Sequence, residues 1–126
     1  MDDGVAIESI SAITLATHDM ARSVAFYGAL GFDLTYGGPE ASFTVFKAGP
    51  NYLNVVLAAA DASWNWWGRF VVYVSDVDAH YQRALEAGLS PEFAPRDAPW
   101  NERYFHLIDP DGHEVSFARR LAAPEA

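Results

Sequence analysis

Two stretches of the chain follow the same order of apolar and polar positions. Ile13 to Phe32 reads ITLATHDMARSVAFYGALGF, and Phe70 to Leu89 reads FVVYVSDVDAHYQRALEAGL, at a constant offset of 57 residues. Each begins with an apolar strand pattern, continues with the 3.6-residue period of a helix, and ends in a glycine and a hydrophobic residue. Asp19 and Asp76 are placed to cap the two helices at their N-termini. The pattern therefore predicts a strand followed by a helix, twice.

The predicted helices, about Met20 to Leu30 and Val77 to Ala87, are each followed by a meander of strands. A second correspondence, at an offset of 62, aligns SFTVFKAGPNYLNVV with YFHLIDPDGHEVSFA, and the five extra residues fall in the proline-rich SPEFAPRDAPWNE. We therefore expect an α+β fold of two tandem βαβββ modules, about residues 9–60 and 68–120, within one domain of residues 1–126. The eight strands are expected to form a cup-shaped mixed sheet with the helices on its outer face.

The stretch YFHLIDPDGHEVSFARR predicts a hairpin whose turn decides which side chains face the cup. A three-residue loop of Pro110, Asp111 and Gly112 puts Leu107 opposite Val115 on the core face. Alternate side chains of each strand then face the cup, and the repeat extends the assignment to the first module. The residues predicted to face the cup are Ala12, Thr14, Ala16, Ser42, Thr44, Phe46, Tyr52, Asn54, Val56, Arg69, Val71, Tyr73, Tyr104, His106, Ile108, Glu114, Ser116 and Ala118.

Composition and charge narrow the classes of function. The chain has 126 residues, of which 51% are hydrophobic, and this fits a single globular domain. The lack of cysteine excludes thiolate zinc sites and cysteine nucleophiles. A formal charge of -9 opposes binding to nucleic acid and favours a neutral or cationic small ligand. Because neither a long apolar run nor a signal-peptide pattern is present, we expect no membrane segment and a cytoplasmic location.

The segments MARSVAFYGALGF, VSDVDAHYQRALEAGL and IDPDGHEVSF, in this order, resemble the vicinal oxygen chelate superfamily over about residues 9–120. This superfamily includes glyoxalase I, extradiol dioxygenases, fosfomycin resistance enzymes and bleomycin resistance proteins. The resemblance implies a homodimer in which two chains complete paired cups. Because members change their chemistry by changing cup residues, the resemblance specifies the fold more closely than the function.

The resemblance also implies where metal-using members hold their metal, namely on the first and last strands of each module. Those positions are Ala12, Asn54, Arg69 and Ser116 in this chain, and none of these is a good metal ligand. We therefore expect no metal and no cofactor. Among the remaining cup residues, His106 is expected as a hydrogen-bonded wall residue and Glu114 as a solvated rim residue. His18, His80 and His113 are expected on the surface.

Four tryptophans lie in segments that are predicted to be loops or strand edges. Indole rings stack well on planar or cationic ligands. Trp64, Trp66 and Trp67, in SWNWWG, either contact a ligand or close the seam between the modules or a dimer interface. Trp100 precedes the first aspartate of DPDG by nine residues, and bleomycin resistance proteins, which the chain resembles here, carry a tryptophan of the drug cleft at this spacing.

Three hypotheses remain at this point. The first is a metal-independent binding protein that sequesters a planar aromatic or cationic natural product, as in antibiotic self-resistance. The second is a glyoxalase-like or dioxygenase-like enzyme, which would use either a non-standard metal set around His106 and Glu114 or acid/base chemistry at His106, Tyr104 and Arg69. The third is a structural or regulatory module whose aromatic residues serve dimerisation. The ligand-binding residues of the first hypothesis are Trp100, Trp66, Trp67, Tyr52, Asn54, Arg69, Tyr73, His106, Ser116 and Phe46.

Overall fold

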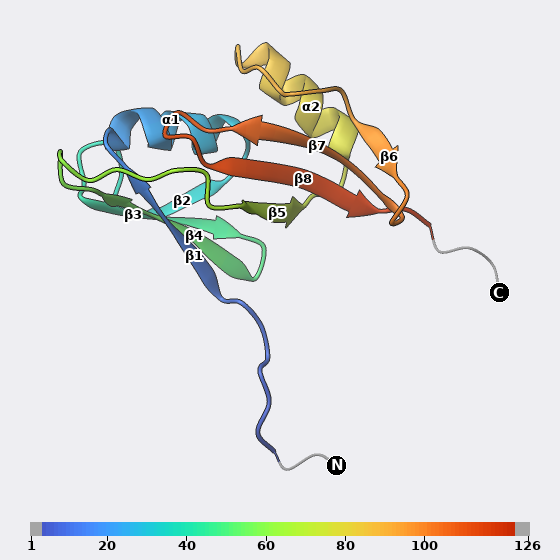
Figure 1. The fold of residues 1–126 in the computed structure, drawn as a ribbon, viewed down its shortest axis with the longest axis horizontal. Coiled ribbons are helices and arrows are strands. Elements are labelled where there is room, and N and C mark those ends of the chain that lie inside the picture. The colour runs from blue at the N-terminus through green and yellow to red at the C-terminus, as the bar shows by residue number, and fades with distance from the viewer. Residues whose placement is uncertain (1–3, 123–126) are drawn as a thin grey trace.

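The computed structural model describes residues 4–122, and its elements repeat one order twice (Figure 1). The first module consists of β1 (Ala12–Thr17), α1 (Met20–Ala29), β2 (Asp33–Tyr36), β3 (Phe43–Ala48) and β4 (Asn51–Leu57). The second consists of β5 (Arg69–Tyr73), α2 (Val77–Glu86), β6 (Arg96–Ala98), β7 (Glu102–Ile108) and β8 (Glu114–Arg120). The predicted α+β fold of two βαβββ modules is confirmed.

The eight strands form two four-stranded mixed sheets. Sheet 1 has the order β1-β4-β3-β2, and sheet 2 has the order β5-β8-β7-β6. In each sheet the first strand of the module pairs in parallel with the last, and the other pairs are antiparallel. Figure 1 shows both helices on the same side of the strands. The opposite faces of the sheets are therefore available for a ligand or a partner.

Both helices begin as the sequence predicts. The Asp19 side chain accepts a hydrogen bond from the backbone N–H of Arg22, and the Asp76 side chain accepts one from that of Ala79. Each bond satisfies one of the N–H groups that an α-helix leaves free in its first turn. The helices end one residue before their predicted limits. No helix of residues 4–122 is long and apolar enough to cross a membrane.

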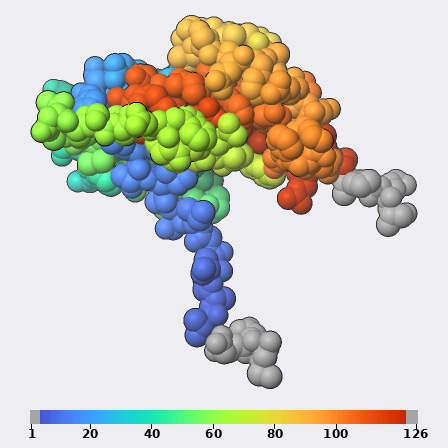
Figure 2. Space-filling model, viewed as in Figure 1, coloured from blue at the N-terminus to red at the C-terminus, as the bar shows by residue number. Residues whose placement is uncertain are grey.

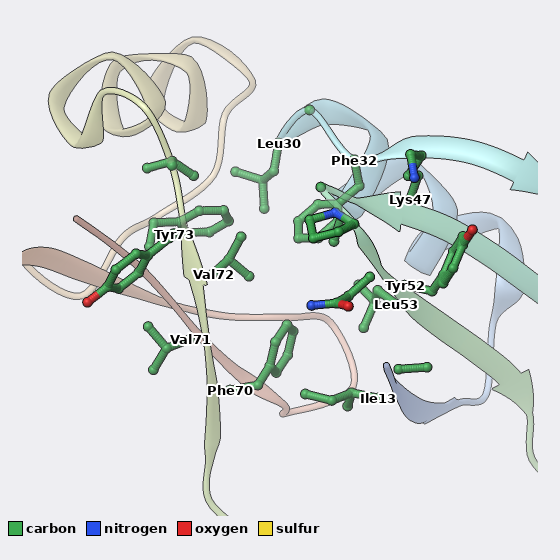
Figure 3. Close-up of a pocket in the computed structure, with 18 of the residues that line it drawn as sticks. Ile13, Leu30, Phe32, Lys47, Tyr52, Leu53, Phe70, Val71, Val72 and Tyr73 are labelled. Atoms are coloured by element: carbon green, nitrogen blue, oxygen red, sulfur yellow. The ribbon is translucent and has the colours of Figure 1, made fainter. Parts of the chain in front are cut away.

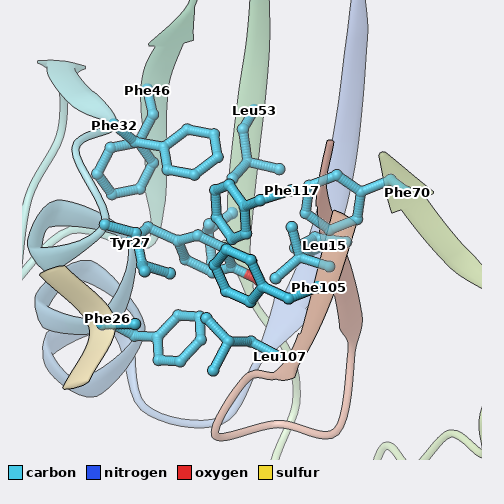
Figure 4. Packing of buried hydrophobic residues seen from close by; sticks show 14 of the residues in the cluster. Leu15, Phe26, Tyr27, Phe32, Phe46, Leu53, Phe70, Phe105, Leu107 and Phe117 are labelled. Atoms are coloured by element: carbon cyan, nitrogen blue, oxygen red, sulfur yellow. The ribbon is translucent and has the colours of Figure 1, made fainter. Parts of the chain in front are cut away.

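The two modules share one aromatic core (Figure 4). Tyr27, Phe46, Phe105 and Phe117 are among its largest fully buried side chains. Phe105 and Phe117 stack with ring centroids 5.4 Å apart, and Phe32 of the first module meets Phe117 of the second edge to face. Burial of each such side chain contributes roughly 1.5–3 kcal/mol. The modules are thus joined by packing as well as by the chain.

The β7–β8 hairpin has the predicted three-residue loop. The backbone N–H of Asp109 donates to the carbonyl of His113 over 2.8 Å, and Gly112 adopts a left-handed conformation with φ of 89°. Leu107 lies opposite Val115 on the buried face. The assignment of cup and core faces in this hairpin is therefore confirmed.

The β3–β4 hairpin differs, and it reverses part of the prediction. Its loop has two residues, because Ala48 pairs with Asn51. This register places Phe46 opposite Leu53 and Thr44 opposite Val55, so both Phe46 and Thr44 are fully buried in the core. The prediction that Phe46 and Thr44 face the cup is wrong, because a one-residue change in the loop moves every side chain of a strand to the other face.

The DPDG turn of the second module docks on the first module. The Tyr27 hydroxyl of α1 donates to Oδ2 of Asp109 over 2.5 Å. Oδ1 of Asp109 accepts from the backbone N–H groups of Asp111 and His113. Asp111 in turn accepts from the Thr17 hydroxyl and pairs with Arg22 at 3.0 Å. The turn thus fixes how the modules meet.

Candidate functional site

The open face of sheet 2 brings together several of the predicted ligand-binding residues. Across β5, β8 and β7, one row contains Val71, Ser116 and His106, and the next contains Tyr73, Ala118 and Tyr104. These side chains alternate with the core residues of the same strands, so they leave the sheet on the side away from α2. We refer to this surface as the sheet 2 face.

A succession of rings runs along this face, and we name Phe93, Tyr104, His106 and Trp100 the aromatic row. The Trp100 and Tyr104 rings lie 5.5 Å apart between centroids, and Tyr104 and His106 lie 5.1 Å apart. Phe93 meets Tyr104 and His106 edge to face at 5.4 and 5.1 Å. The spacing of these rings is typical of favourable aromatic pairs.

Phe93 and Arg96 were not among the predicted site residues. The backbone N–H of Glu92 donates to the carbonyl of His106, and Arg96 pairs with Tyr104 across β6 and β7, so this segment lies along the strand edge. The Arg96 guanidinium carbon lies 3.8 Å from the Phe93 ring centroid, a cation–π contact. The three prolines of this segment obscure the sequence pattern of its short strand. The pairing of Arg96 with Tyr104 is visible only in the register of β6 on β7 in the structure.

Trp100 lies at the exposed end of the aromatic row. Its side chain is 61% exposed, and its indole N–H donates to the Glu102 carboxylate over 3.1 Å. The same carboxylate accepts a hydrogen bond from the Tyr73 hydroxyl. The neighbouring Asn101 has a φ of 71°, which belongs to the tight turn between β6 and β7. The exposed Trp100 ring can therefore contact a ligand without a change in the backbone.

His106 is 9% exposed, and its Nδ1 atom is buried without a hydrogen-bond partner among the described residues. Burial lowers the pKa of His106, and the positive charge of Arg69 lowers it further. The imidazole is therefore neutral at pH 7. His106 lies in the wall of the sheet 2 face, and among residues 4–122 the hydrogen bond expected of it is missing at Nδ1.

The positions that would hold a metal in metal-using members do not fit one. Ala12 has no donor atom, and Asn54 donates from Nδ2 to the Thr14 hydroxyl over 3.3 Å. Arg69 forms an ion pair with Glu114, the carboxylate that lies opposite it on β8. The Glu114 side chain is 8% exposed, so the prediction of a solvated rim residue is wrong. Between residues 4 and 122 no group of three His, Asp or Glu side chains converges as metal ligands would.

A cavity of about 670 Å³ lies between the modules (Figure 3). Its lining includes Leu30, Phe32 and Tyr52 of the first module, and Arg69 and the rest of β5. Figure 3 shows that Val71 and Tyr73 leave β5 on the side away from Leu30 and Phe32. None of the four residues of the aromatic row lines the cavity, and of the predicted ligand-binding residues only Tyr52, Arg69 and Tyr73 line it.

Two tryptophans of the linker pack where the two modules meet. Trp64 stacks on His18 and His113 with centroids 4.8 and 5.5 Å away. The Trp67 indole N–H donates to Nδ1 of His113 over 2.7 Å, and Nε2 of His113 is 2.7 Å from the Ala16 carbonyl. His113 is therefore buried, and its expected surface position is wrong. In Figure 2 the linker, in lime green, follows the red and orange strands of the second module.

The remaining predicted residues lie apart from the aromatic row. Trp66 is 64% exposed on the linker. Tyr52 and Asn54 are on β4 of sheet 1, where Lys47 lies 5.2 Å from the Tyr52 ring centroid. Phe46 is in the core. Of the ten predicted residues, the sheet 2 face thus brings together Arg69, Tyr73, Trp100, His106 and Ser116.

Two βαβββ modules with a shared core and an open strand face define a vicinal oxygen chelate fold. The chain belongs to the Glyoxalase/Bleomycin resistance protein/Dioxygenase superfamily, which it matches over residues 9–117. A glyoxalase/bleomycin resistance protein/dioxygenase from Nocardioides is 25% identical, with a TM-score of 0.74 over 96% of this chain and 89% of that one. A bleomycin-binding protein solved with bleomycin shares the fold, with 20% identity and a TM-score of 0.71 over 90% of this chain and 99% of that one.

One curated relative is an uncharacterized protein of Mycobacterium bovis. It is 46% identical over 46 residues, which amount to 36% of this chain and 30% of that protein. The match therefore spans less than a third of the relative and assigns no activity.

Proposed function

We propose that the protein is a metal-independent binding protein that sequesters a planar aromatic or cationic natural product. The observation that carries this proposal is the aromatic row, with Trp100 exposed at its end and with Nδ1 of His106 left without a hydrogen-bond partner among residues 4–122. Stacking on such rings contributes roughly 0.5–1.5 kcal/mol per contact beyond the burial of area. Sequestration requires affinity and no chemical step.

The unsuitable donor set at the four metal positions supports the metal-independent part of the proposal. The Arg69 guanidinium has no acceptor atom to offer a metal, and its ion pair with Glu114 occupies a carboxylate that a metal would need. The superfamily includes bleomycin resistance proteins, and the similar fold that was solved with bleomycin supports a small-molecule ligand. Resistance to a toxic planar compound in the cytoplasm is the biological role that fits such binding.

The site is proposed to lie in a homodimer. Val71 and Tyr73 are about half exposed on sheet 2, and Tyr52 is 42% exposed on the corresponding face of sheet 1, so residues 4–122 leave part of both faces uncovered. A second copy would cover these faces and enclose each aromatic row as a cup. Light scattering at micromolar concentration is expected to give the mass of a dimer, and a monomer would contradict this part of the proposal.

A fluorescence screen tests the proposed function. Planar antibiotics and aromatic metabolites are titrated into the protein while tryptophan emission is followed. Every compound that quenches is then measured by calorimetry with wild type, Trp100→Ala and Trp66→Ala. Loss of stacking and of buried area is expected to weaken binding by about tenfold in Trp100→Ala.

Trp66 is a matched comparison because it is as exposed as Trp100 but lies on the linker. If Trp66→Ala weakens binding and Trp100→Ala does not, the ligand lies at the linker and the proposed site is wrong. If no planar compound binds, the proposed function itself is contradicted.

A further inference from the structure

The two ring nitrogens of His106 have different surroundings. Nδ1 is fully buried and has no partner among the described residues, whereas Nε2, which has no hydrogen bond to these residues either, is not fully buried. His106 lies opposite Ser116 of β8 and between the Phe93 and Tyr104 rings, and none of them supplies a hydrogen bond to the imidazole. The polar edge of the ring that a ligand can reach is therefore the one with Nε2.

This asymmetry selects a tautomer. A neutral imidazole has one N–H donor and one bare nitrogen acceptor. A proton on Nδ1 would leave a buried donor without an acceptor, which costs roughly 1–3 kcal/mol. A proton on Nε2 faces solvent or a ligand, and buried Nδ1 is then a bare acceptor. Among the buried backbone groups of proteins, unpaired acceptors are likewise commoner than unpaired N–H donors. The structure therefore favours the tautomer with the proton on Nε2.

Burial keeps His106 neutral, and the charged groups around it favour particular ligands. Burial is the largest effect and lowers the pKa of His106; Arg69 on β5 and Arg96 on β6 also lower it, and Glu114 on β8 and Glu92 beside β7 raise it. Glu114 is already paired with Arg69. Arg96 lies over the Phe93 ring beside the aromatic row. A ligand on this row therefore meets a neutral donor and a nearby cation.

We propose that His106 is the specificity-determining residue of the site, and that its Nε2–H donates a hydrogen bond to an acceptor on a planar ligand stacked on the aromatic row. The acceptor is a carbonyl, a carboxylate or a heteroaromatic nitrogen at the edge of the ring system. The inference rests on the proposed function and narrows it, because it selects neutral or anionic acceptor-bearing ligands over planar hydrocarbons and cations.

A matched pair of probes tests the inference. Anthraquinone-2-sulfonate and anthracene-2-sulfonate have the same charge and a similar shape, but only the first carries carbonyl acceptors. Wild type is expected to bind the anthraquinone about fivefold more tightly, as one added neutral hydrogen bond provides. His106→Phe keeps an aromatic ring without a donor and is expected to remove this preference, while the affinity for the anthracene stays within about twofold because stacking is retained.

His106→Gln is the second variant, because its amide can place an N–H near the position of Nε2, and it is expected to restore part of the preference. Equal affinity of wild type for the two probes, or a preference that survives in His106→Phe, would overturn the inference and leave the proposed function intact. If neither probe binds wild type while another planar compound of the fluorescence screen does, the inference fails and the proposed function stands. If no planar compound binds at all, both fail.

The tautomer can be measured without any ligand. Long-range ¹⁵N–¹H correlation spectra at pH 7.5 distinguish a protonated imidazole nitrogen from a bare one. We expect the His106 pattern of a bare Nδ1 and a protonated Nε2, with His106→Gln used to assign the resonances. A protonated Nδ1 would contradict the inference even if the probes bind.

Discussion

His106 is held neutral by its surroundings on the sheet 2 face. Its ring is buried against the Phe93 and Tyr104 rings, and the cation of Arg69 lies close enough to disfavour protonation. The same features make His106 selective for ligand acceptors and sensitive to acid. At this scale the fold therefore sets the chemistry of one side chain through desolvation and one neighbouring charge.

The lowered pKa of His106 predicts a pH dependence of stability. In the unfolded chain the imidazole has the ordinary pKa of about 6.5, so the unfolded state takes up the proton first as the pH falls. The stability that neutral His106 contributes is thus present above about pH 6.5 and is lost as the pH decreases toward the folded-state pKa. The free energy of unfolding, measured with urea, is expected to decrease more between pH 7.5 and pH 5 for wild type than for His106→Gln. The same pH dependence in both proteins would contradict this account.

The hydrogen bond between Tyr27 and Asp109 is a second residue-scale feature. Burial, together with the charge of Asp109, raises the pKa of Tyr27 well above its ordinary value, so the hydroxyl keeps its proton and donates to the carboxylate. Tyr27→Phe would leave one carboxylate oxygen of Asp109 unsatisfied in the interior and is expected to lower the free energy of unfolding by roughly 1–3 kcal/mol. Urea unfolding measures the loss. Tyr36→Phe, at an exposed hydroxyl, is the control, and an equal change in both variants would show that the buried bond contributes nothing.

At the scale of elements, the helices and the β7–β8 hairpin could be predicted because their patterns are local. Asp19, Asp76 and the DPDG turn each act within a few residues of their own position. The β3–β4 hairpin could not be predicted from the repeat, because its loop is one residue shorter than that of β7–β8. Phe46 consequently lies in the core. Phe93 and Arg96 could not be predicted as site residues, because the proline-rich sequence around them gives no strand pattern. Only the structure shows that their segment lies beside β7.

The DPDG turn depends on the backbone freedom of Gly112. Its φ of 89° is left-handed, and no atom lies within 4 Å of the position that a Cβ would take, so alanine there causes backbone strain without a clash. Gly112→Ala is expected to lower the free energy of unfolding by about 1–2 kcal/mol. Thermal or urea unfolding measures the change.

Gly28 supplies the control for this substitution. It is exposed on α1, has no positive φ and likewise has no atom near the Cβ position. Gly28→Ala is expected to raise the free energy of unfolding by about 0.5–1 kcal/mol, because alanine is the better helix former. A stabilising effect of Gly112→Ala as well would mean that the turn does not need its left-handed glycine.

At the scale of the whole molecule, aromatic and hydrogen-bond contacts join the modules on one side of the sheets, and the other side carries the aromatic row. The Phe32–Phe117 contact, the Tyr27–Asp109 bond and the linker tryptophans at His113 all connect the first module to the second. The helices cover one side of the sheets, and the aromatic row lies on the other. This division lets the ligand face vary without a cost to the core, which is how one fold carries different functions.

The central claim is that the sheet 2 face binds a planar ligand without a metal, and calorimetric titration with anthraquinone-2-sulfonate in the presence of excess EDTA tests it most directly. The account predicts that wild type binds with the same affinity in EDTA as in buffer with added zinc or manganese. It also predicts that Trp100→Ala weakens binding by about tenfold while its melting temperature changes by only a few degrees, because an exposed turn residue contributes little to the core. Binding that is lost in EDTA and restored by the metal would contradict the account.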